Sequence, residues 1–295
     1  MERRLPYFVA VWAAACASGG SRGTAGTAAP TPQHPTAPSA QPPARVSRPD
    51  VVRYGPSAMR YLIHQRVHVE QTFGGQQQAQ DLGARIFVAA TIVGPADSAG
   101  YPTTFTVDSV VADSGTPPAV ALNVTRARHI VYNGRVDGRG EFHQGAMSDS
   151  VAAQSLVQLL GHFREFLPRI PAQGATLGAQ WTDTLTGMQR GAGAAVTRKA
   201  VVHSTAAAWE DRGGIRSLRL DIGGIYTVAG AGDNGGQPFE LGGSGTASGV
   251  AYIAVDGRFL GGESRDSSNV TVTLPVQGLT IPVVQVSRAT VTVQP

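Results

Sequence analysis

The chain has 295 residues, of which 42% are hydrophobic and 15% are charged, and its formal net charge is +4. The positive charges are spread along the sequence, with Lys199 as the only lysine. Nucleic-acid-binding proteins gather Lys and Arg on one face, so this composition argues against a nucleic-acid partner. Cys16 is the only cysteine, which excludes an intramolecular disulfide, a cysteine-ligated zinc or iron–sulfur centre and a cysteine nucleophile in the folded part.

The first fifteen residues have the pattern of an export signal. Arg3 and Arg4 form a short basic start, the stretch 7–15 is apolar, and three alanines lead directly into Cys16. A helix needs about 20 apolar residues to span a bilayer, so this run is too short for that role. We therefore expect residues 1–15 to act as a signal peptide.

The residues around Cys16 resemble the lipobox of bacterial lipoproteins. In that family the cysteine after the small residues is lipidated and becomes the mature N-terminus. This sequence departs from the family at Ala13, where leucine is preferred. The resemblance implies a lipid anchor at Cys16, and Ala17 and Ser18 in place of aspartate imply the outer membrane, with the periplasmic or surface face left open. An ordinary secretory signal that happens to contain a cysteine is the alternative.

Residues 16–50 follow as a lipidated cysteine and a tether. The segment consists mainly of Ala, Pro, Gly, Ser and Thr, with almost no bulky apolar side chain to offset the chain entropy of folding. As a flexible coil it would span roughly 30 to 35 Å. We expect the folded part, residues 51–295, to stand off the membrane.

One amphipathic helix is predicted over residues 149–167. Ser148 to Ser150 offer N-cap side chains, and Pro168 ends the helix. Its apolar face recurs at three- and four-residue steps and contains Val151, Leu156, Leu159, Leu160, Phe163 and Leu167. The stretch Trp181–Leu185 then alternates as a strand.

Most of the remaining sequence alternates between apolar and polar residues, as in half-buried strands. A short helix is predicted from Pro117 to about Ala127. Strands are expected at residues 59–73, 82–93, 103–112, 129–136, 141–147, 194–209, 215–228, 239–255, 258–274 and 280–293. Residues 51–295 are thus mainly β, as one domain or as halves 51–147 and 179–295 joined by the helix.

Long strands with many glycines favour a large curved antiparallel sheet, because glycine permits the bends that curvature requires. The predicted arrangement is such a sheet, or two packed half-sheets, covered by the one amphipathic helix. This layout is similar to the half-barrel fold of the envelope lipoprotein carriers LolA and LolB. Gly178 and Trp181 also resemble the G-D-x-W strand of uncharacterised bacterial lipoproteins, with Ala179 and Gln180 replacing the acidic position. The resemblance transfers no catalytic residue.

Several polar groups were weighed as catalytic or metal sites. His64, His68 and Glu70 share one strand face, but residues four apart on a strand lie about 13 Å from each other, so the two histidines cannot bind one ion. His68 and Glu70 are close enough to bind one ion together. A metal-assisted hydrolase based on these two residues is therefore the third functional hypothesis. The scattered acids that would be needed for glycoside hydrolysis are Glu165, Asp183, Asp221 and Glu263, and sequence alone does not bring two together. No cofactor or metal is predicted.

The sequence therefore predicts a membrane-anchored envelope lipoprotein without enzymatic activity. A lipid or other hydrophobic ligand is expected between helix and sheet, in a space lined by Leu156, Leu160, Phe163, Trp181, Leu220 and Tyr226. If these side chains instead pack on each other, the alternative is a structural or protein-interaction scaffold of the envelope.

Overall fold

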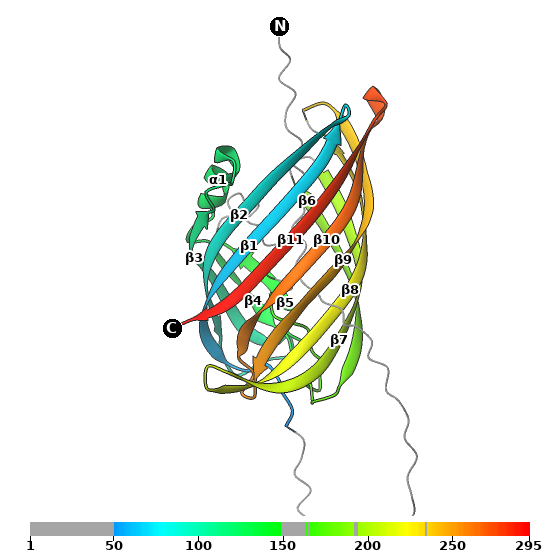
Figure 1. Cartoon of the computed structure of the whole chain (residues 1–295). Helices are drawn as coiled ribbons and strands as arrows, with labels where there is room; N and C mark the ends of the chain where they lie inside the picture. Colours follow the sequence, from blue (N-terminus) through cyan, green and yellow to red (C-terminus); the bar gives the residue numbers. More distant parts are fainter. Residues whose placement is uncertain (1–49, 149–162, 164–165, 192–193, 234) are drawn as a thin grey trace, which may run out of the picture.

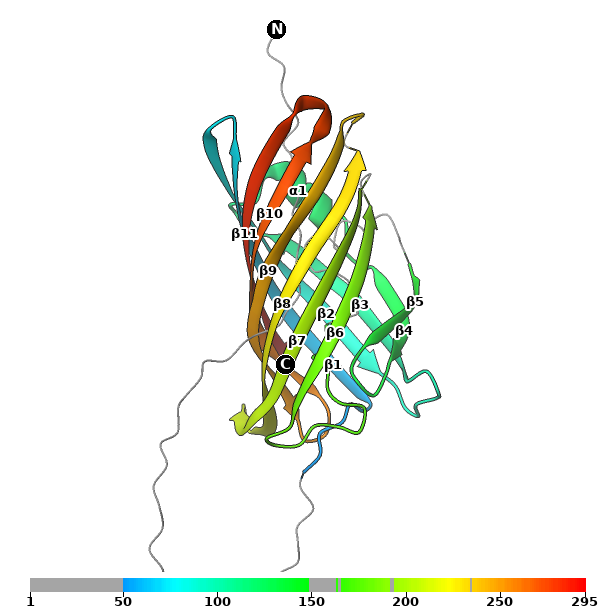
Figure 2. The same cartoon turned by 90° about the vertical axis from the view of Figure 1, so that its right-hand side faces the viewer.

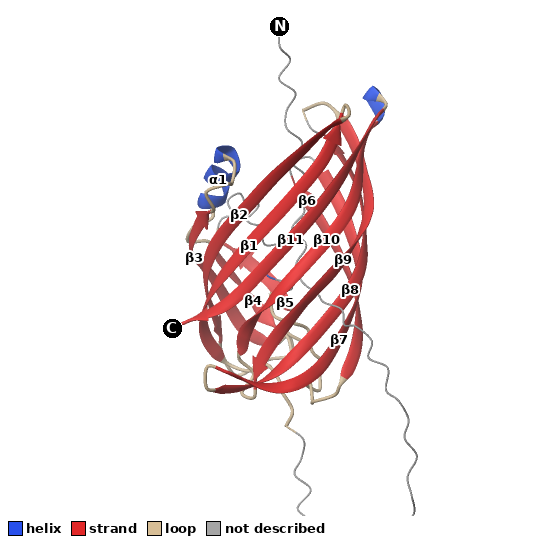
Figure 3. Cartoon of the chain, in the orientation of Figure 1, coloured by secondary structure: helices blue, strands red, loops and turns tan. Residues whose placement is uncertain are grey.

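The computed structural model describes residues 50–148, 163, 166–191, 194–233 and 235–295. Within these ranges the chain is mainly β, as predicted (Figure 3). The helices are α1 (Pro118–Thr125) and the 3-10 turn η2 (Pro275–Gln277). No helix in the described part is both long enough and apolar enough to cross a membrane.

The described residues form eleven strands, and the predicted strands are confirmed with small shifts at their ends. The strand predicted at residues 181–185 continues to Gly191, and the short helix predicted from Pro117 is present as α1. The strands are β1 (Ser57–Phe73), β2 (Gln76–Ile92), β3 (Tyr101–Ala112), β4 (Val131–Val136), β5 (Phe142–Met147), β6 (Gln180–Gly191), β7 (Ala194–Arg212), β8 (Ile215–Asp233), β9 (Pro238–Ala254), β10 (Phe259–Leu274) and β11 (Leu279–Gln294).

All strands belong to one antiparallel sheet, with the order β5-β4-β3-β2-β1-β11-β10-β9-β8-β7-β6. The first and last strands of the chain pair with each other, in the register Tyr61 with Val293 and Val67 with Ser287. Of the two predicted arrangements, the single curved sheet is observed. The sheet wraps strongly around its inner face, and its two edges are β5 and β6 (Figures 1 and 2).

The two faces of the sheet differ in polarity because side chains alternate along each strand. On β1, Tyr61, Ile63 and Val67 are buried, whereas Arg66 between them is exposed. Polar outer positions and apolar inner positions of this kind give the curved sheet its core on the concave side.

Glycines on the inner face allow β9 and β10 to come close where the sheet bends. A Cβ atom at Gly243 or Gly249 would collide with the backbone of β10. A Cβ atom at Gly245 would collide with the ring of Tyr226 on β8. These positions explain the curvature that the glycine content predicted.

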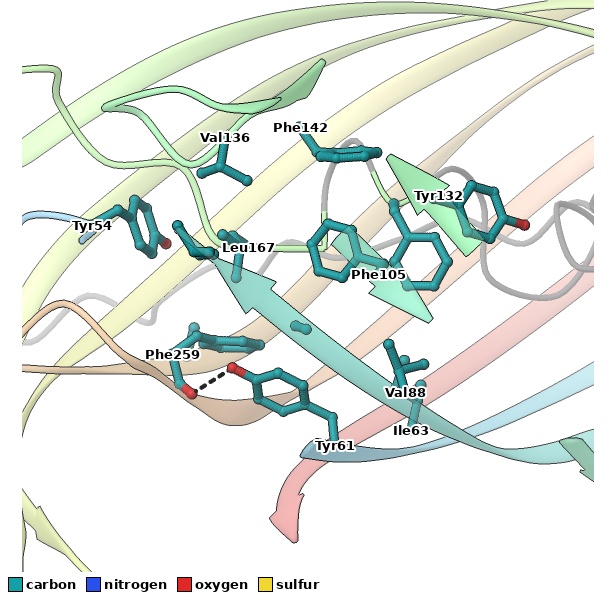
Figure 4. Close-up of a cluster of buried hydrophobic side chains, with 14 of the residues drawn as sticks. Tyr54, Tyr61, Ile63, Val88, Phe105, Tyr132, Val136, Phe142, Leu167 and Phe259 are labelled. Atoms are coloured by element: carbon teal, nitrogen blue, oxygen red, sulfur yellow. Dashed lines mark hydrogen bonds between the residues drawn. The ribbon is translucent and has the colours of Figure 1, made fainter. Parts of the chain in front are cut away.

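The main core draws on β1 to β5 and on β7 to β10, and it is rich in aromatic side chains (Figure 4). Phe105 is fully buried at its centre, with ring centroids 4.9 Å from both Phe142 and Phe163 and 5.4 Å from Phe166. Each such aromatic pair adds about 0.5–1.5 kcal/mol beyond simple burial of area. The connection from β5 to β6 thus supplies part of the core.

Most of the helix predicted over residues 149–167 lies outside the described residues, and the described part of the chain shows no covering helix. The described residues near its predicted end are nevertheless inside the fold. Phe163 and Leu167 are both buried in the main core. Val52 and Ala175, which are also buried in this core, form an isolated antiparallel bridge.

We predict that Gly245→Ala destabilises the protein, because the added methyl group would push the Tyr226 ring out of place. Overpacking of this kind costs about 1–3 kcal/mol of unfolding free energy, measurable by chemical denaturation. Gly242→Ala on the same strand is the control, since nothing lies within 4 Å of its Cβ position. Equal stability of the two variants would contradict this account.

Candidate functional site

A cavity of about 80 Å³ lies between residues 166–169 and the inner face of β6–β11. A water molecule needs about 10–15 Å³ on the same measure, so the cavity has room for several waters or a small organic group. Its walls are mainly apolar and include Phe166, Leu167, Leu185, Val202, Ile222 and Phe259. A space of this kind suits an apolar group better than water.

The cavity exists because small residues occupy inward positions of the sheet. Gly249, Ala251, Gly262 and Ala289 all line it. In the neighbouring core, inward positions hold large side chains such as Leu220 and fill the space between the strands. The absence of side-chain volume on β9 to β11 therefore leaves the cavity open.

Two ion pairs lie at one end of the cavity and link the β4–β5 hairpin to the connection and to β6. A guanidinium N–H of Arg139, in the turn after β4, donates to Asp183 Oδ1. Arg169 Nη2 lies 2.7 Å from Glu141 Oε2, and both side chains are mostly buried. Asp183 and Arg169 line the cavity. The end of the cavity nearest the sheet edges is therefore charged in both senses.

Two buried polar atoms without a hydrogen-bond partner belong to residues that line the cavity, and two more belong to neighbouring residues. Among the described residues these atoms are Asp183 Oδ2, Arg139 Nε, Arg169 Nε and Trp181 Nε1, with Arg198 Nε as a fifth elsewhere. Each such atom costs about 1–3 kcal/mol in lost solvation. Native proteins hold few of them, so the unpartnered atoms of Asp183 and Arg169 in the cavity wall need an explanation.

A second polar group lies deeper inside the sheet. Tyr226 donates a 2.5 Å hydrogen bond to Asp266 Oδ1, and Arg198 lies 3.4 Å from Asp266 Oδ2 and 4.0 Å above the Tyr226 ring. Burial raises the pKa of Asp266 to about 6, while Tyr226 and Arg198 act in the opposite direction. These three groups satisfy one another, apart from Arg198 Nε, and form a structural polar layer.

The predicted ligand-lining residues occupy several different places. Phe163 and Leu220 are buried in the main core, and Trp181 packs against it. Tyr226 belongs to a separate cluster with Ala200. None of these four predicted residues lines the cavity, whereas Leu156 and Leu160 lie outside the described residues.

The charged end of the cavity was not predicted. Asp183 was considered only as one of several scattered acids, although it stands between Trp181 and Leu185 on the inward face of β6. An acid flanked at both second neighbours by apolar residues signals a buried carboxylate. Arg139 and Arg169 carry no comparable signal, because both lie in irregular segments.

The remaining acids of the glycoside hypothesis do not join Asp183 as a catalytic pair in the described structure. Asp221 accepts a 2.8 Å hydrogen bond from Arg219, its neighbour on the outer face of β8. Glu263 lines the same cavity as Asp183, but it is exposed, and among the described residues no contact joins the two acids. Glu165 lies outside the described residues.

The histidines of β1 lie on the outer face, each with its own carboxylate. His64 Nε2 is 2.9 Å from Asp113 Oδ2. His68 Nδ1 is 2.7 Å from Asp81 Oδ1, and its Nε2 is 3.1 Å from Glu70 Oε1. Hydrogen bonds to Asp81 and, to a smaller degree, Glu70 raise the pKa of His68. Two carboxylates favour the imidazolium form, which has no lone pair for a metal.

One described group of three side chains has the spacing of a metal site. Ligand atoms of Asp137, Glu141 and His143 lie within 4.8 Å of one another. Asp137 Oδ1 already accepts 2.9 Å hydrogen bonds from the backbone N–H groups of Arg139 and Glu141. The Glu141 side chain pairs with Arg169. These bonds account for the group as the framework of the β4–β5 turn.

Comparison with known proteins assigns no family. No protein-family profile matches the chain, and no curated protein matches it. Among solved structures, OccK2 (OpdF) of Pseudomonas aeruginosa aligns with a TM-score of 0.26 and 9% identity, covering 81% of this chain and 98% of that one. DynF from the dynemicin biosynthesis pathway of Micromonospora chersina aligns with a TM-score of 0.21 and 8% identity, covering 86% and 92%. Scores this low establish neither a shared fold nor a shared function.

We predict that the His68 imidazole titrates above the ordinary histidine pKa, and that Asp81→Asn lowers this pKa more than Glu70→Gln does. NMR titration of the ring protons measures both shifts. Because the folded-state pKa is the higher one, these bonds stabilise the fold fully below the unfolded pKa of about 6.5. That stabilisation disappears as the pH rises through the folded-state pKa. A larger decrease of the His68 pKa in Glu70→Gln than in Asp81→Asn would contradict the conclusion that Asp81 contributes more than Glu70.

Proposed function

We propose that this protein is an exported, lipid-anchored envelope protein without enzymatic activity that holds a small, mainly apolar ligand inside its curved sheet. The observation that supports this proposal is the cavity between residues 166–169 and β6–β11. Its walls are aliphatic and aromatic, which is the usual lining of a small-molecule site. A short acyl chain, or the end of a longer one, fits such walls.

The composition of the cavity favours a binding site over a packing defect. Gly249, Ala251, Gly262 and Ala289 keep their inward positions small on three neighbouring strands. Protein interiors are otherwise close-packed, and empty space costs stability in proportion to its volume. A bound apolar group would restore the contacts that these small residues do not make.

The proposed lipid anchor is based on the sequence of the N-terminus, and it would hold the binding domain at the membrane. Lipidation at Cys16 would attach the protein to the envelope, in our proposal to the outer membrane. The tether would end at Asp50, which pairs with Arg216 at 2.7 Å. Val52 is held by two backbone hydrogen bonds to Ala175. The tether would thus leave the domain from a fixed point at Asp50 and Val52.

We predict that the full-length protein, purified without stripping detergent, carries a reproducible small-molecule adduct in native mass spectrometry. Ala251→Met should remove this adduct, because its side chain would fill the cavity from β9. Ala229→Met on the outer face of β8 is the control and should retain it, since Ala229 is exposed. A clean apo mass for the unmodified chain would reject the binding proposal and favour the envelope scaffold.

We predict that Cys16→Ser releases the protein from the membrane fraction, because serine cannot carry the thioether-linked lipid. Cell fractionation and metabolic labelling with an alkyne-tagged fatty acid measure the two effects. Ser18→Ala, two residues away, should change neither result. Membrane association and labelling that persist in Cys16→Ser would overturn the anchor.

A further inference from the structure

We infer that the cavity recognises a ligand whose polar head is neutral and offers both a hydrogen-bond donor and an acceptor, such as a primary amide or an alcohol. Asp183 and Arg169 would bind this head, and the apolar walls would hold the tail. The inference rests on the proposed function, because it names the class of ligand for the same cavity.

Asp183 is the group of the cavity wall that requires a hydrogen-bond donor. Its residue is only 7% exposed and lines the cavity. One carboxylate oxygen, Oδ1, is bonded to Arg139, whereas Oδ2 is buried without a partner. A ligand N–H or O–H at this point would satisfy the free oxygen and form a charge-assisted hydrogen bond.

One group of the cavity wall requires a hydrogen-bond acceptor. Arg169 Nε is buried without a partner, and Arg169 lines the cavity. Trp181 Nε1 is also buried and unpartnered, but Trp181 does not line the cavity, so Arg169 is the donor available to a ligand there. A carbonyl or hydroxyl oxygen accepts from such donors, so a head that combines both roles matches the cluster.

The charges of the cluster exclude an ionised head. Arg139 balances Asp183, and Arg169 balances Glu141, so these four side chains sum to zero. Glu263 also lines the cavity, but it is exposed to solvent, which screens its charge. A buried charge that lacks its own counterion is strongly unfavourable. The carboxylate of a fatty acid or the ammonium of an alkylamine would add such a charge, whereas an amide or a hydroxyl would not.

The cluster is held in place before any ligand arrives. The Ile170 N–H donates a 3.0 Å hydrogen bond to the Arg139 carbonyl. Tyr54 donates its hydroxyl hydrogen bond to the Pro168 carbonyl, and Asp137 fixes the turn through the Arg139 N–H. Groups fixed in this way lose little entropy on binding, which favours selective recognition of the head.

The test compares four probes with the same eight-carbon tail and different heads: octanamide, 1-octanol, octanoate and octylamine. Isothermal titration calorimetry on the full-length protein at neutral pH measures each Kd. We expect octanamide and 1-octanol to bind at least tenfold more tightly than the two ionised probes. Equal affinity of all four would overturn the inference and leave the unpartnered atoms to trapped water.

Charge variants separate recognition from simple loss of stability. Asp183→Asn gives the cluster a net charge of one positive unit. The affinity for octanoate should therefore rise at least tenfold relative to the affinity for octanamide. Arg169→Gln gives the cluster a net charge of one negative unit. The affinity for octylamine should therefore rise by a similar factor relative to octanamide. Asp221→Asn removes the same charge from the outer face and should leave the order of the probes unchanged.

A purely structural role for these residues would weaken all four probes by the same factor, and that result would reject the inference. Binding of none of the probes would reject it as well. The native mass spectrum then decides the proposed function separately: a retained adduct would preserve a binding protein with a different head specificity, and a clean apo mass would reject both proposals.

Discussion

The pairing of β1 with β11 is the constraint on which the rest of the structure depends. Twelve consecutive residue pairs from Arg60 with Gln294 to Gln71 with Val283 join the first strand to the last. This ladder puts the first and last strands in the middle of the sheet and makes β5 and β6, consecutive in sequence, its two edges. Among the described residues of the connection between these edges, Phe163, Leu167 and Ile170 are buried in the main core.

The described residues of that connection also form one wall of the cavity and part of its charged end. Residues 166–170 meet the β4–β5 turn through the Ile170 hydrogen bond and through the pair of Arg169 with Glu141. Arg139 reaches the other edge strand by binding Asp183. Buried ion pairs stabilise a fold only weakly, because desolvation offsets their attraction. Their unsatisfied atoms suit recognition of a polar head better than they suit stability.

The inner face as a whole combines apolar regions with two polar groups of different character. The layer of Tyr226, Asp266 and Arg198 is nearly self-satisfied. The cluster around Asp183 is not, although both groups lie on the concave side of one sheet. This contrast is the reason why we propose the Asp183 end of the cavity as the binding site for the ligand head. It also distinguishes the cavity from the small voids of ordinary packing, whose walls carry no free donors or acceptors.

The sequence by itself determined the strands, since alternation along β1 or β8 and turn glycines are local signals. It also determined that glycines would allow strong curvature, and it raised the export signal and the lipid anchor as hypotheses. Only the tertiary structure decided that β1 pairs with β11, that Asp183 meets Arg139 across the sheet edges, and that a cavity lies beside Leu185 and Ile222. Long-range register depends on how the inner faces of distant strands match, and no local pattern of residues encodes which distant charges become neighbours.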